Sequence, residues 1–150
     1  MRKGTKIVLV IVVILVVLQF FRPANNASQA DPVNDIAAGY DVPMDVLMIL
    51  NDACYDCHSN YSTYPWYHNI QPVGAWMDHH IKEAKRHLNF SEFATYSAKD
   101  AAHAFHEMSE MMEEHAMPIS SYKLLHKKGR LTDEQYTRVE QWAKKMEAQF

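Results

Sequence analysis

Two cysteines and a histidine in this chain have the residue types and the spacing of a covalent cofactor site. Cys54, Cys57 and His58 form the motif CxxCH, and the two cysteines are the only ones among the 150 residues. This spacing is the attachment signature of a c-type haem. The two thiols can add across the vinyl groups of one porphyrin, and the histidine can coordinate the iron from the same turn. We therefore expect one covalent haem c, attached through Cys54 and Cys57 and ligated by His58.

A CxxC pair also occurs in thioredoxin-like redox sites and in zinc sites. A thioredoxin-like motif follows a strand, whereas the segment before Cys54 has a helical pattern. A zinc site needs two further ligands, which in this chain would have to be histidines or carboxylates. A disulfide between Cys54 and Cys57 would close only a very short loop and add little stability. Haem attachment is the use of both thiols that the sequence favours.

A second axial ligand decides whether the iron only exchanges electrons or also binds a small molecule. We expect Met117 in this role, because it lies before Pro118 and outside the helical pattern, in a segment where cytochromes c commonly supply a methionine. Packing in the core is the other role open to Met117. His80 and His126 are the alternative ligands, since both lie beside apolar residues.

Aromatic residues cluster within ten positions of the attachment histidine, at Tyr61, Tyr64, Trp66 and Tyr67. A haem buries a large apolar face, and aromatic rings can cover it while a hydroxyl or indole group binds a propionate. We expect Tyr64 and Trp66 to belong to the haem-binding site. Ordinary packing in the core of a small domain is the alternative for each ring.

The N-terminal residues form an almost unbroken apolar run from Ile7 to Phe21, preceded by Arg2, Lys3 and Lys6. Counted from Gly4 the segment has about 18 residues, close to the lower end of what spans a hydrocarbon core of roughly 30 Å. The basic residues in front of it predict a cytoplasmic N-terminus. A cleaved signal peptide is the alternative, with residues 28–30 (Ser-Gln-Ala) as the cleavage pattern. We favour an uncleaved transmembrane helix, which predicts a single-pass protein of the bacterial inner membrane with its haem domain in the periplasm.

The charge of the remaining chain excludes one class of partner. Beyond residue 30 there are 11 Lys and Arg against 18 Asp and Glu, so the charge is 11 − 18 = −7 with neutral histidines. Nucleic acid is therefore not expected as a partner. Residues 31–56 contain six Asp and no base, whereas residues 123–130 contain four bases and no acid. This asymmetry could steer a redox partner, or it could be an ordinary solvated surface.

The chain divides into a membrane anchor or signal peptide (residues 1–22), a polar linker (23–34) and a haem-binding domain (35–150). No segment of the domain alternates as a strand does, so we expect an all-α, cytochrome c-like domain wrapped around one haem. Helical patterns cover residues 44–53, 74–88, 97–114, 120–127 and 132–149, and an aromatic loop covers 59–72.

Apolar residues at helical spacing predict which helix faces pack inward. The third long helix presents Ala101, Phe105, Met108 and Met112, and the last presents Tyr136, Val139, Ala143 and Met146 with Trp142 beside them. In helix 74–88 the corresponding residues are Trp76, His80, Ala84 and Leu88.

Five segments in order resemble the bacterial haem-binding domain family, known mainly from Bacteroidota and related Gram-negative bacteria. They are CYDCHSN (54–60), YPWYHNIQPV (64–73), HLNFSEF (87–93), MPISSYKLLH (117–126) and RLTDEQ (130–135). The resemblance covers nearly all of residues 40–145 and implies a small periplasmic mono-haem domain with Cys54, Cys57 and His58 as its attachment residues. In relatives a glycine and an acidic residue tend to precede the Met-Pro segment, where this chain has His115 and Ala116.

Electron transfer is the function that we expect from these features, with redox proteins as the electron donor and acceptor. The alternative is a haem-based sensor or ligand-binding module with an open or displaceable sixth iron site. Catalysis such as peroxide reduction would need an acid/base residue above an open iron, and the sequence identifies none among its histidines. We therefore do not expect an enzyme, and we expect no catalytic residues.

Overall fold

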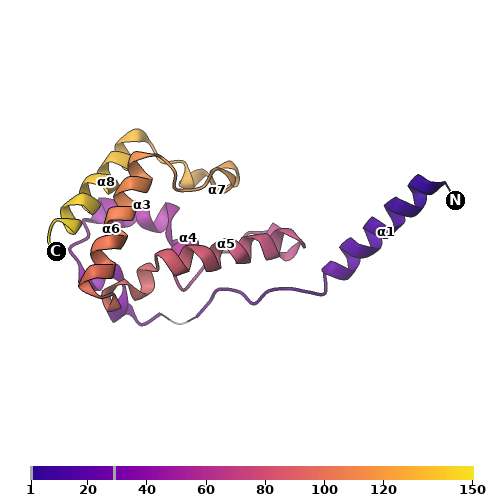
Figure 1. The fold of residues 1–150 in the computed structure, drawn as a ribbon, viewed down its shortest axis with the longest axis horizontal. Coiled ribbons are helices and arrows are strands. Elements are labelled where there is room, and N and C mark those ends of the chain that lie inside the picture. The colour runs from indigo at the N-terminus through magenta and orange to yellow at the C-terminus, as the bar shows by residue number, and fades with distance from the viewer. Residues whose placement is uncertain (1, 29) are drawn as a thin grey trace.

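The computed structural model describes residues 2–28 and 30–150, and within them every regular element is helical (Figure 1). The α-helices are α1 (Lys3–Leu18), α2 (Ile36–Gly39), α3 (Met44–Ala53), α4 (Tyr55–His58), α5 (Val73–His87), α6 (Ala98–Glu113), α7 (Ser120–Leu125) and α8 (Asp133–Glu147). Short 3₁₀ helices are η1 (Pro32–Asn34), η2 (Trp66–Asn69), η3 (Phe90–Thr95) and η4 (Lys127–Gly129). The predicted all-α class is confirmed for the described residues.

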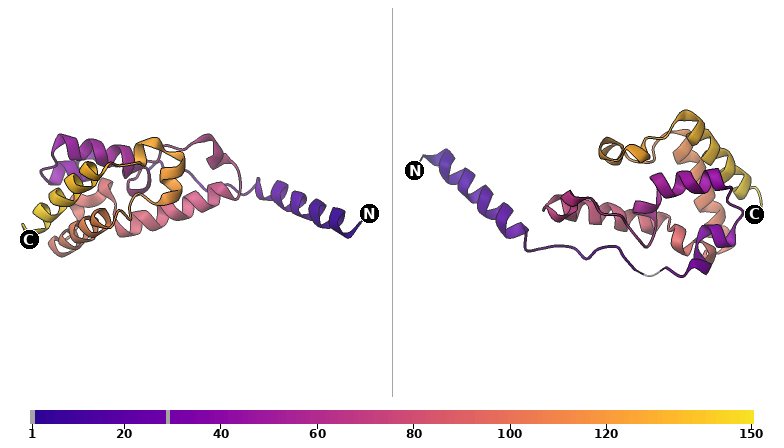
Figure 2. Two further views of the ribbon diagram at one scale, coloured as in Figure 1. Left: turned by 90° about the horizontal axis from the view of Figure 1, so that it is seen from above. Right: turned by 180° about the vertical axis from the view of Figure 1, so that it is seen from behind.

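Helices α6 and α8 lie side by side at one end of the domain, with α3 beside them (Figures 1 and 2). Ser97 caps α6 by accepting a hydrogen bond from the Asp100 amide, and Thr132 forms a reciprocal capping box with Gln135 at the start of α8. Both caps were predicted from the sequence. The inward faces are also as predicted, since Ala101, Phe105, Met108 and Met112 on α6 and Tyr136, Val139, Ala143 and Met146 on α8 are all buried.

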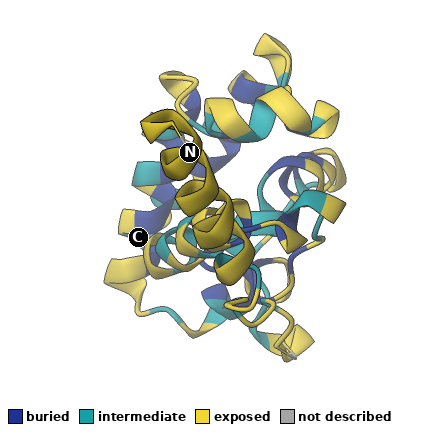
Figure 3. Ribbon diagram, turned by 90° about the vertical axis from the view of Figure 1, so that its right-hand side faces the viewer, coloured by how far each residue is buried: buried dark blue, intermediate teal, exposed yellow. Residues whose placement is uncertain are grey.

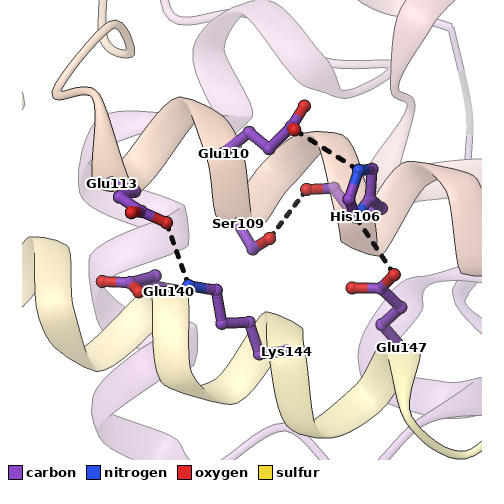
Figure 4. A network of polar contacts seen from close by, with 7 residues as sticks. All are labelled: His106, Ser109, Glu110, Glu113, Glu140, Lys144 and Glu147. Atoms are coloured by element: carbon purple, nitrogen blue, oxygen red, sulfur yellow. Dashed lines mark hydrogen bonds and ion pairs between the residues drawn. The ribbon is translucent and has the colours of Figure 1, made fainter.

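A polar network runs along the outer side of the α6–α8 contact (Figure 4). The His106 ring lies between carboxylates of Glu110 on its own helix and Glu147 on α8, at 3.4 and 3.0 Å. Lys144 of α8 bonds Glu113 of α6 at 3.0 Å. These pairs are exposed, so each contributes little to stability, and the buried faces carry the packing of α6 on α8.

The centre of the core is a group of aromatic rings. Phe105 is fully buried and contacts the rings of Tyr40, Phe93 and Trp142, with centroid distances of 5.2, 4.9 and 5.5 Å. Trp142, which the sequence placed beside the apolar face, is itself buried, because its indole nitrogen donates to the Asp41 carbonyl at 3.0 Å. A partner for the N–H group allows the ring to be buried without an unsatisfied donor.

The long helix α5 extends away from this core toward α1 (Figures 1 and 2). The buried residues of α5 are Gly74 and Ile81. Trp76 and His80, which the sequence predicted to face inward, are not buried, and Trp76 is exposed. The glycine is required here, because a Cβ at position 74 would lie 2.2 Å from the carbonyl oxygen of His68. Trp76 and His80 of the stripe face a cavity, described below, whereas Leu88 packs against the core.

The chain leaves α6 through a residue with a left-handed backbone. His115 has a φ of 53°, and its ring stacks on Tyr136 at a centroid distance of 4.0 Å. This position after a helix favours glycine. In this chain a histidine occupies the position, and its ring packs on Tyr136 of α8.

Helix α1 projects from the domain (Figures 1 and 2), and the burial colouring marks its ribbon as exposed (Figure 3). None of its residues is buried, and the apolar side chains from Ile7 to Val17 are each 43% exposed or more. In residues 2–28 and 30–150, no helix combines the length and the apolar character that a membrane crossing requires. The acidic segment 31–56 and the basic segment 123–130 meet in the fold where Lys128 of η4 pairs with Asp52 of α3. Arg138 of α8, outside the basic segment, pairs with Asp45.

Replacing Phe105 by alanine tests the aromatic core. We expect Phe105→Ala to lower the free energy of unfolding by about 3–5 kcal/mol, since a fully buried phenylalanine leaves a cavity. The measurement is denaturant unfolding of the purified full chain, followed by circular dichroism. Val33→Ala, at an exposed site, is the control and should change the midpoint little. Equal stability of both variants would contradict this description of the core.

Candidate functional site

The CxxCH motif forms a tight turn at the junction of α3 and α4. Cys54 ends α3, and its carbonyl accepts hydrogen bonds from the Cys57 and His58 amides at 3.1 and 2.9 Å. The four residues from Tyr55 to His58 make one helical turn. The motif therefore presents both thiols and the imidazole from consecutive turns of helix, with each side chain half-buried.

The His58 imidazole is held by a backbone carbonyl at the end of α5. Its Nδ1 atom lies 3.0 Å from the Leu88 carbonyl oxygen. Burial lowers the pKa of His58 below its ordinary value, so the ring is neutral at neutral pH. A neutral imidazole whose Nδ1–H donates to a carbonyl has its lone pair on Nε2, which is the arrangement of a histidine that ligates a metal.

The turn after His58 is fixed by buried polar side chains. The Asn60 amide donates to Ser91 Oγ at 3.1 Å, and the Asn89 side chain donates to Asn60 Oδ1 at 2.9 Å. The Asn60 side chain also donates to Glu92 at 2.6 Å. These bonds join the end of α4 to η3, next to the Leu88 carbonyl that holds His58.

The two thiols are buried enough to remain protonated. Burial is the main cause that raises the pKa of Cys54 to about 12 and that of Cys57 to about 11. A reactive CxxC motif has a lowered thiol pKa, so these cysteines do not resemble a dithiol redox site. They are free cysteines in this structure. No group of three or more His, Cys, Asp or Glu side chains suited to a metal ion occurs among the described residues.

An open cavity of about 630 Å³, including the space open to solvent, lies against the motif. Its walls come from α4, the aromatic loop, α5 and the segment around α7. The lining is mostly apolar and aromatic: Asp56, Cys57, Ser62, Thr63, Tyr64, Tyr67, Val73, Trp76, Met77, His80, Ile81, Ile119, Ser121, Tyr122, Leu125 and His126.

Asp56, inside the CxxCH motif, ties two walls of this cavity together. One carboxylate oxygen accepts a hydrogen bond from the Tyr122 hydroxyl of α7 at 2.8 Å, and the other accepts from the Thr63 amide at 3.0 Å. Tyr122 stacks on His126 at 4.0 Å, and the Gly129 backbone passes so close to the tyrosine ring that a Cβ there would lie 2.5 Å from it. Asp56 therefore holds α7 over the cavity.

The predicted aromatic residues divide between the cavity and the surface. Tyr64 lines the cavity, and its hydroxyl accepts a hydrogen bond from the Asn26 amide at 2.7 Å. Tyr67 also lines it and lies 3.3 Å from His126 Nε2. Trp66 is 75% exposed and does not line the cavity. The structure thus brings Tyr64, Tyr67 and Trp76 to the site and places Trp66 on the outer surface.

The candidates for the sixth ligand occupy two different places. Met117 is half-buried and packs against the core, as Cys54 also does, and it is outside the cavity lining. His80 and His126 line the cavity. Both ring nitrogens of His126 have neighbours, Tyr122 O at 3.2 Å and Tyr67 Oη at 3.3 Å. His80 has Nδ1 at 2.8 Å from the Trp76 carbonyl, which leaves Nε2 as the ligating atom.

Asn26, in the segment expected to be a linker, contacts the site from the N-terminal side. Its side chain donates to Ser59 O and Ser62 Oγ at 2.9 and 2.8 Å and accepts from Lys85 Nζ at 2.8 Å. Burial lowers the pKa of Lys85. Asn26 thus joins the N-terminal segment to α5 and to the residues after the motif. No sequence pattern predicts this role.

These residues fit a covalent haem. The cavity is mostly apolar and Cys57 lines it, both thiols are free, and Nε2 of His58 carries the lone pair. Cys54 and His58 border the cavity through Cys57 in the same turn and are not themselves lining residues. Sequence reasoning identified the motif and Tyr64, but it missed the roles of Asp56 and Tyr122. Both residues can be seen in the sequence, one inside CxxCH and the other shortly after the Met-Pro segment. No sequence pattern predicts that they contact each other.

Comparison with known proteins gives one match. The family model described as haem-binding domain matches residues 13–145. No curated protein and no solved structure matches. The matched range includes the motif, the whole cavity lining and Met117.

The contact between Asp56 and Tyr122 can be tested by removing one hydroxyl. Tyr122→Phe removes a charge-assisted hydrogen bond, which is worth roughly 1.5–3 kcal/mol. We expect the amides of α7 to exchange with solvent about tenfold faster or more, since 1.4 kcal/mol is a factor of ten. Hydrogen exchange of the haem-loaded full chain measures this. Tyr61→Phe, at an exposed position, is the control, and unchanged α7 exchange in Tyr122→Phe would refute the contact.

Proposed function

The chain belongs to the haem-binding domain family, and from this premise we propose that it is a membrane-tethered, periplasmic c-type cytochrome of the Bacteroidota type that transfers single electrons. One observation carries the proposal: the Cys54 carbonyl closes the CxxCH turn by accepting from the Cys57 and His58 amides, and the His58 Nδ1 atom is fixed on the Leu88 carbonyl. A haem-binding domain with this motif has the residues for covalent attachment.

Each residue of the motif has a distinct role in this proposal. Cys54 and Cys57 would hold the haem through thioether bonds, and His58 Nε2 would ligate its iron from one side. The Leu88 carbonyl keeps the imidazole in the tautomer and the orientation that ligation needs. Tyr64, Tyr67 and Trp76 would exclude water from the porphyrin faces. The bound haem supplies one-electron chemistry through the ferric and ferrous states of its iron.

Met117 is the residue that we propose as the second axial ligand. It follows the left-handed turn at His115 and packs against the core, as Cys54 does. His80 is the alternative that the cavity lining supports, since its Nε2 atom is the nitrogen not committed to the Trp76 carbonyl. Either residue would occupy the sixth coordination position of the iron, and methionine would give the higher reduction potential.

Electron transfer requires little more of the protein than filled axial positions and an apolar surrounding. Catalysis at the iron would require an open position with a poised acid or base. The proposal therefore includes no substrate chemistry and no catalytic residues. Redox proteins, one donor and one acceptor, are the proposed partners.

The proposed tether is α1 together with residues 19–21. Its apolar side chains from Ile7 to Val17 and at Phe20 and Phe21 are exposed, and an apolar surface of that extent favours an apolar surrounding. Arg2, Lys3 and Lys6 precede it, which favours a cytoplasmic N-terminus and a haem domain on the outer side of the bacterial inner membrane.

A haem-based sensor is the second candidate function, and the position of Met117 favours it. Because Met117 packs on the core outside the cavity lining, a haem in the cavity could keep its sixth position free for a small molecule. The two functions differ in one property of the reduced protein, which is whether it binds carbon monoxide at once.

Carbon monoxide binding distinguishes electron transfer from sensing. We expect the reduced, haem-loaded full chain to show no immediate spectral change with carbon monoxide, because both axial positions are filled. A potentiometric titration should fit a single one-electron step. Rapid and complete carbon monoxide binding would favour the sensor and contradict the proposed electron-transfer function.

Substitution of Met117 identifies the second ligand. We expect Met117→Ala to lower the reduction potential and to allow carbon monoxide binding, because a thioether ligand raises the potential and fills the site. Met44→Ala, at an exposed site, is the control. If Met117→Ala keeps the wild-type spectrum and His80→Ala opens the iron, the ligand is His80 and the assignment to Met117 is wrong.

A further inference from the structure

The end of α1 is fixed to the haem domain by a pair of hydrogen bonds. The Gln19 side chain donates to the Gln71 carbonyl at 3.1 Å and accepts from the Gln71 amide at 3.0 Å. This glutamine thus pairs with both backbone groups of one residue, as a neighbouring strand would. The turn between η2 and α5 therefore lies at the foot of α1, as both the front and the rear views show (Figures 1 and 2).

Exposed apolar side chains surround this contact. Phe20 and Phe21 directly follow Gln19, and they are 83% and 70% exposed. Trp66, Ile70 and Val73, around Gln71, are also exposed. We call these five residues the foot surface. Scattered apolar residues on a protein surface need no explanation, but a group at the base of an uncovered apolar helix does.

The segment that carries the foot surface is free of formal charge. From residue 57 to residue 77 the sequence contains no Asp, Glu, Lys or Arg, and Asp56 and Asp78 flank the stretch. By contrast, α6 and α8 carry acids and bases along their exposed sides (Figure 4). Arg22 directly follows Phe20 and Phe21 and is the cation closest to them in the sequence. Exposed aromatic residues without charge, followed by an arginine, are the composition found at the boundary between hydrocarbon and lipid headgroups.

From these observations we infer that the foot surface lies on the outer leaflet of the membrane and fixes the orientation of the haem domain. This inference rests on the proposed tether, because α1 brings the lipid to the surface. Its direct consequence concerns the site, since Tyr67, Val73 and Trp76 from the same uncharged segment line the cavity. The haem would therefore lie close to the membrane surface, and the α6–α8 end would point away from it (Figure 1).

Lipid photolabelling of the full chain tests this orientation. The haem-loaded protein is reconstituted into phosphatidylcholine vesicles that contain a phosphatidylcholine with a diazirine on its acyl chain, and labelled residues are mapped by mass spectrometry. We expect labels in α1, at residues 20–21 and in residues 66–73. Met44 and Met48 are the internal control, because they are exposed apolar residues on α3, away from α1. Labels confined to α1, or equal labelling at Met44 and Met48, would overturn the inference.

A substitution of Gln19 tests whether its hydrogen bonds set the orientation. Gln19→Ala removes both bonds to Gln71, so labels at residues 66–73 should be lost while those in α1 remain. Gln149→Ala, an exposed glutamine at the other end of the chain, should leave the pattern unchanged. Undiminished labelling of residues 66–73 in Gln19→Ala would overturn the fixed orientation.

The same samples separate failure of this inference from failure of the proposed function. The absorption spectrum reports haem attachment independently of lipid labels. A haem-loaded chain that is not labelled in α1 would overturn both the tether and the foot surface, and would leave haem attachment standing. Labelling of residues 66–73 in a chain that lacks haem would support the foot surface and count against the cytochrome.

Discussion

The hydrogen bond between His58 Nδ1 and the Leu88 carbonyl is the constraint on which the site depends. It joins the single turn of α4 to the end of α5, and it selects the tautomer in which Nε2 carries the lone pair. The buried bonds among Asn60, Asn89 and Ser91 surround it and fix the two backbone segments that it joins. Burial of the ring lowers the pKa of His58, which keeps the imidazole neutral and able to ligate. Without this contact the motif would supply two thiols but no oriented ligand.

Local patterns in the sequence predicted most of the helices. The 3.6-residue spacing and the caps at Ser97 and Thr132 are properties of contiguous residues, so α6 and α8 and their inward faces could be predicted. The stripe on α5 was placed at helical spacing but not assigned to the cavity, because the same pattern fits a helix that covers a core and one that lines a cofactor site. Trp142 was placed beside the apolar face, since its buried N–H partner, the Asp41 carbonyl, lies far away in the chain.

The site was predictable where its chemistry is contiguous and not where it is assembled by the fold. The spacing of Cys54, Cys57 and His58 alone is enough to predict them as the haem-attachment residues, and that assignment stays a prediction. The bonds from Asp56 to Tyr122 and from Asn26 to the residues after the motif join distant segments through ordinary polar residues, which carry no periodic signal. Together they close the cavity on two sides: Asp56 holds α7, and Asn26 holds the N-terminal segment against the aromatic loop. An aspartate within the CxxCH motif thus holds one wall of the pocket in place.

The central claim is that one haem is bound covalently through the motif, and intact mass measurement after maturation tests it most directly. The full chain should be heavier than its polypeptide by one haem and should keep the coloured group after acid denaturation and solvent extraction. Cys54→Ser/Cys57→Ser, with the thiols replaced at both attachment positions, is the matched control and should have the mass of its polypeptide alone. A wild-type chain with the polypeptide mass, or one that releases its haem on extraction, would contradict the account.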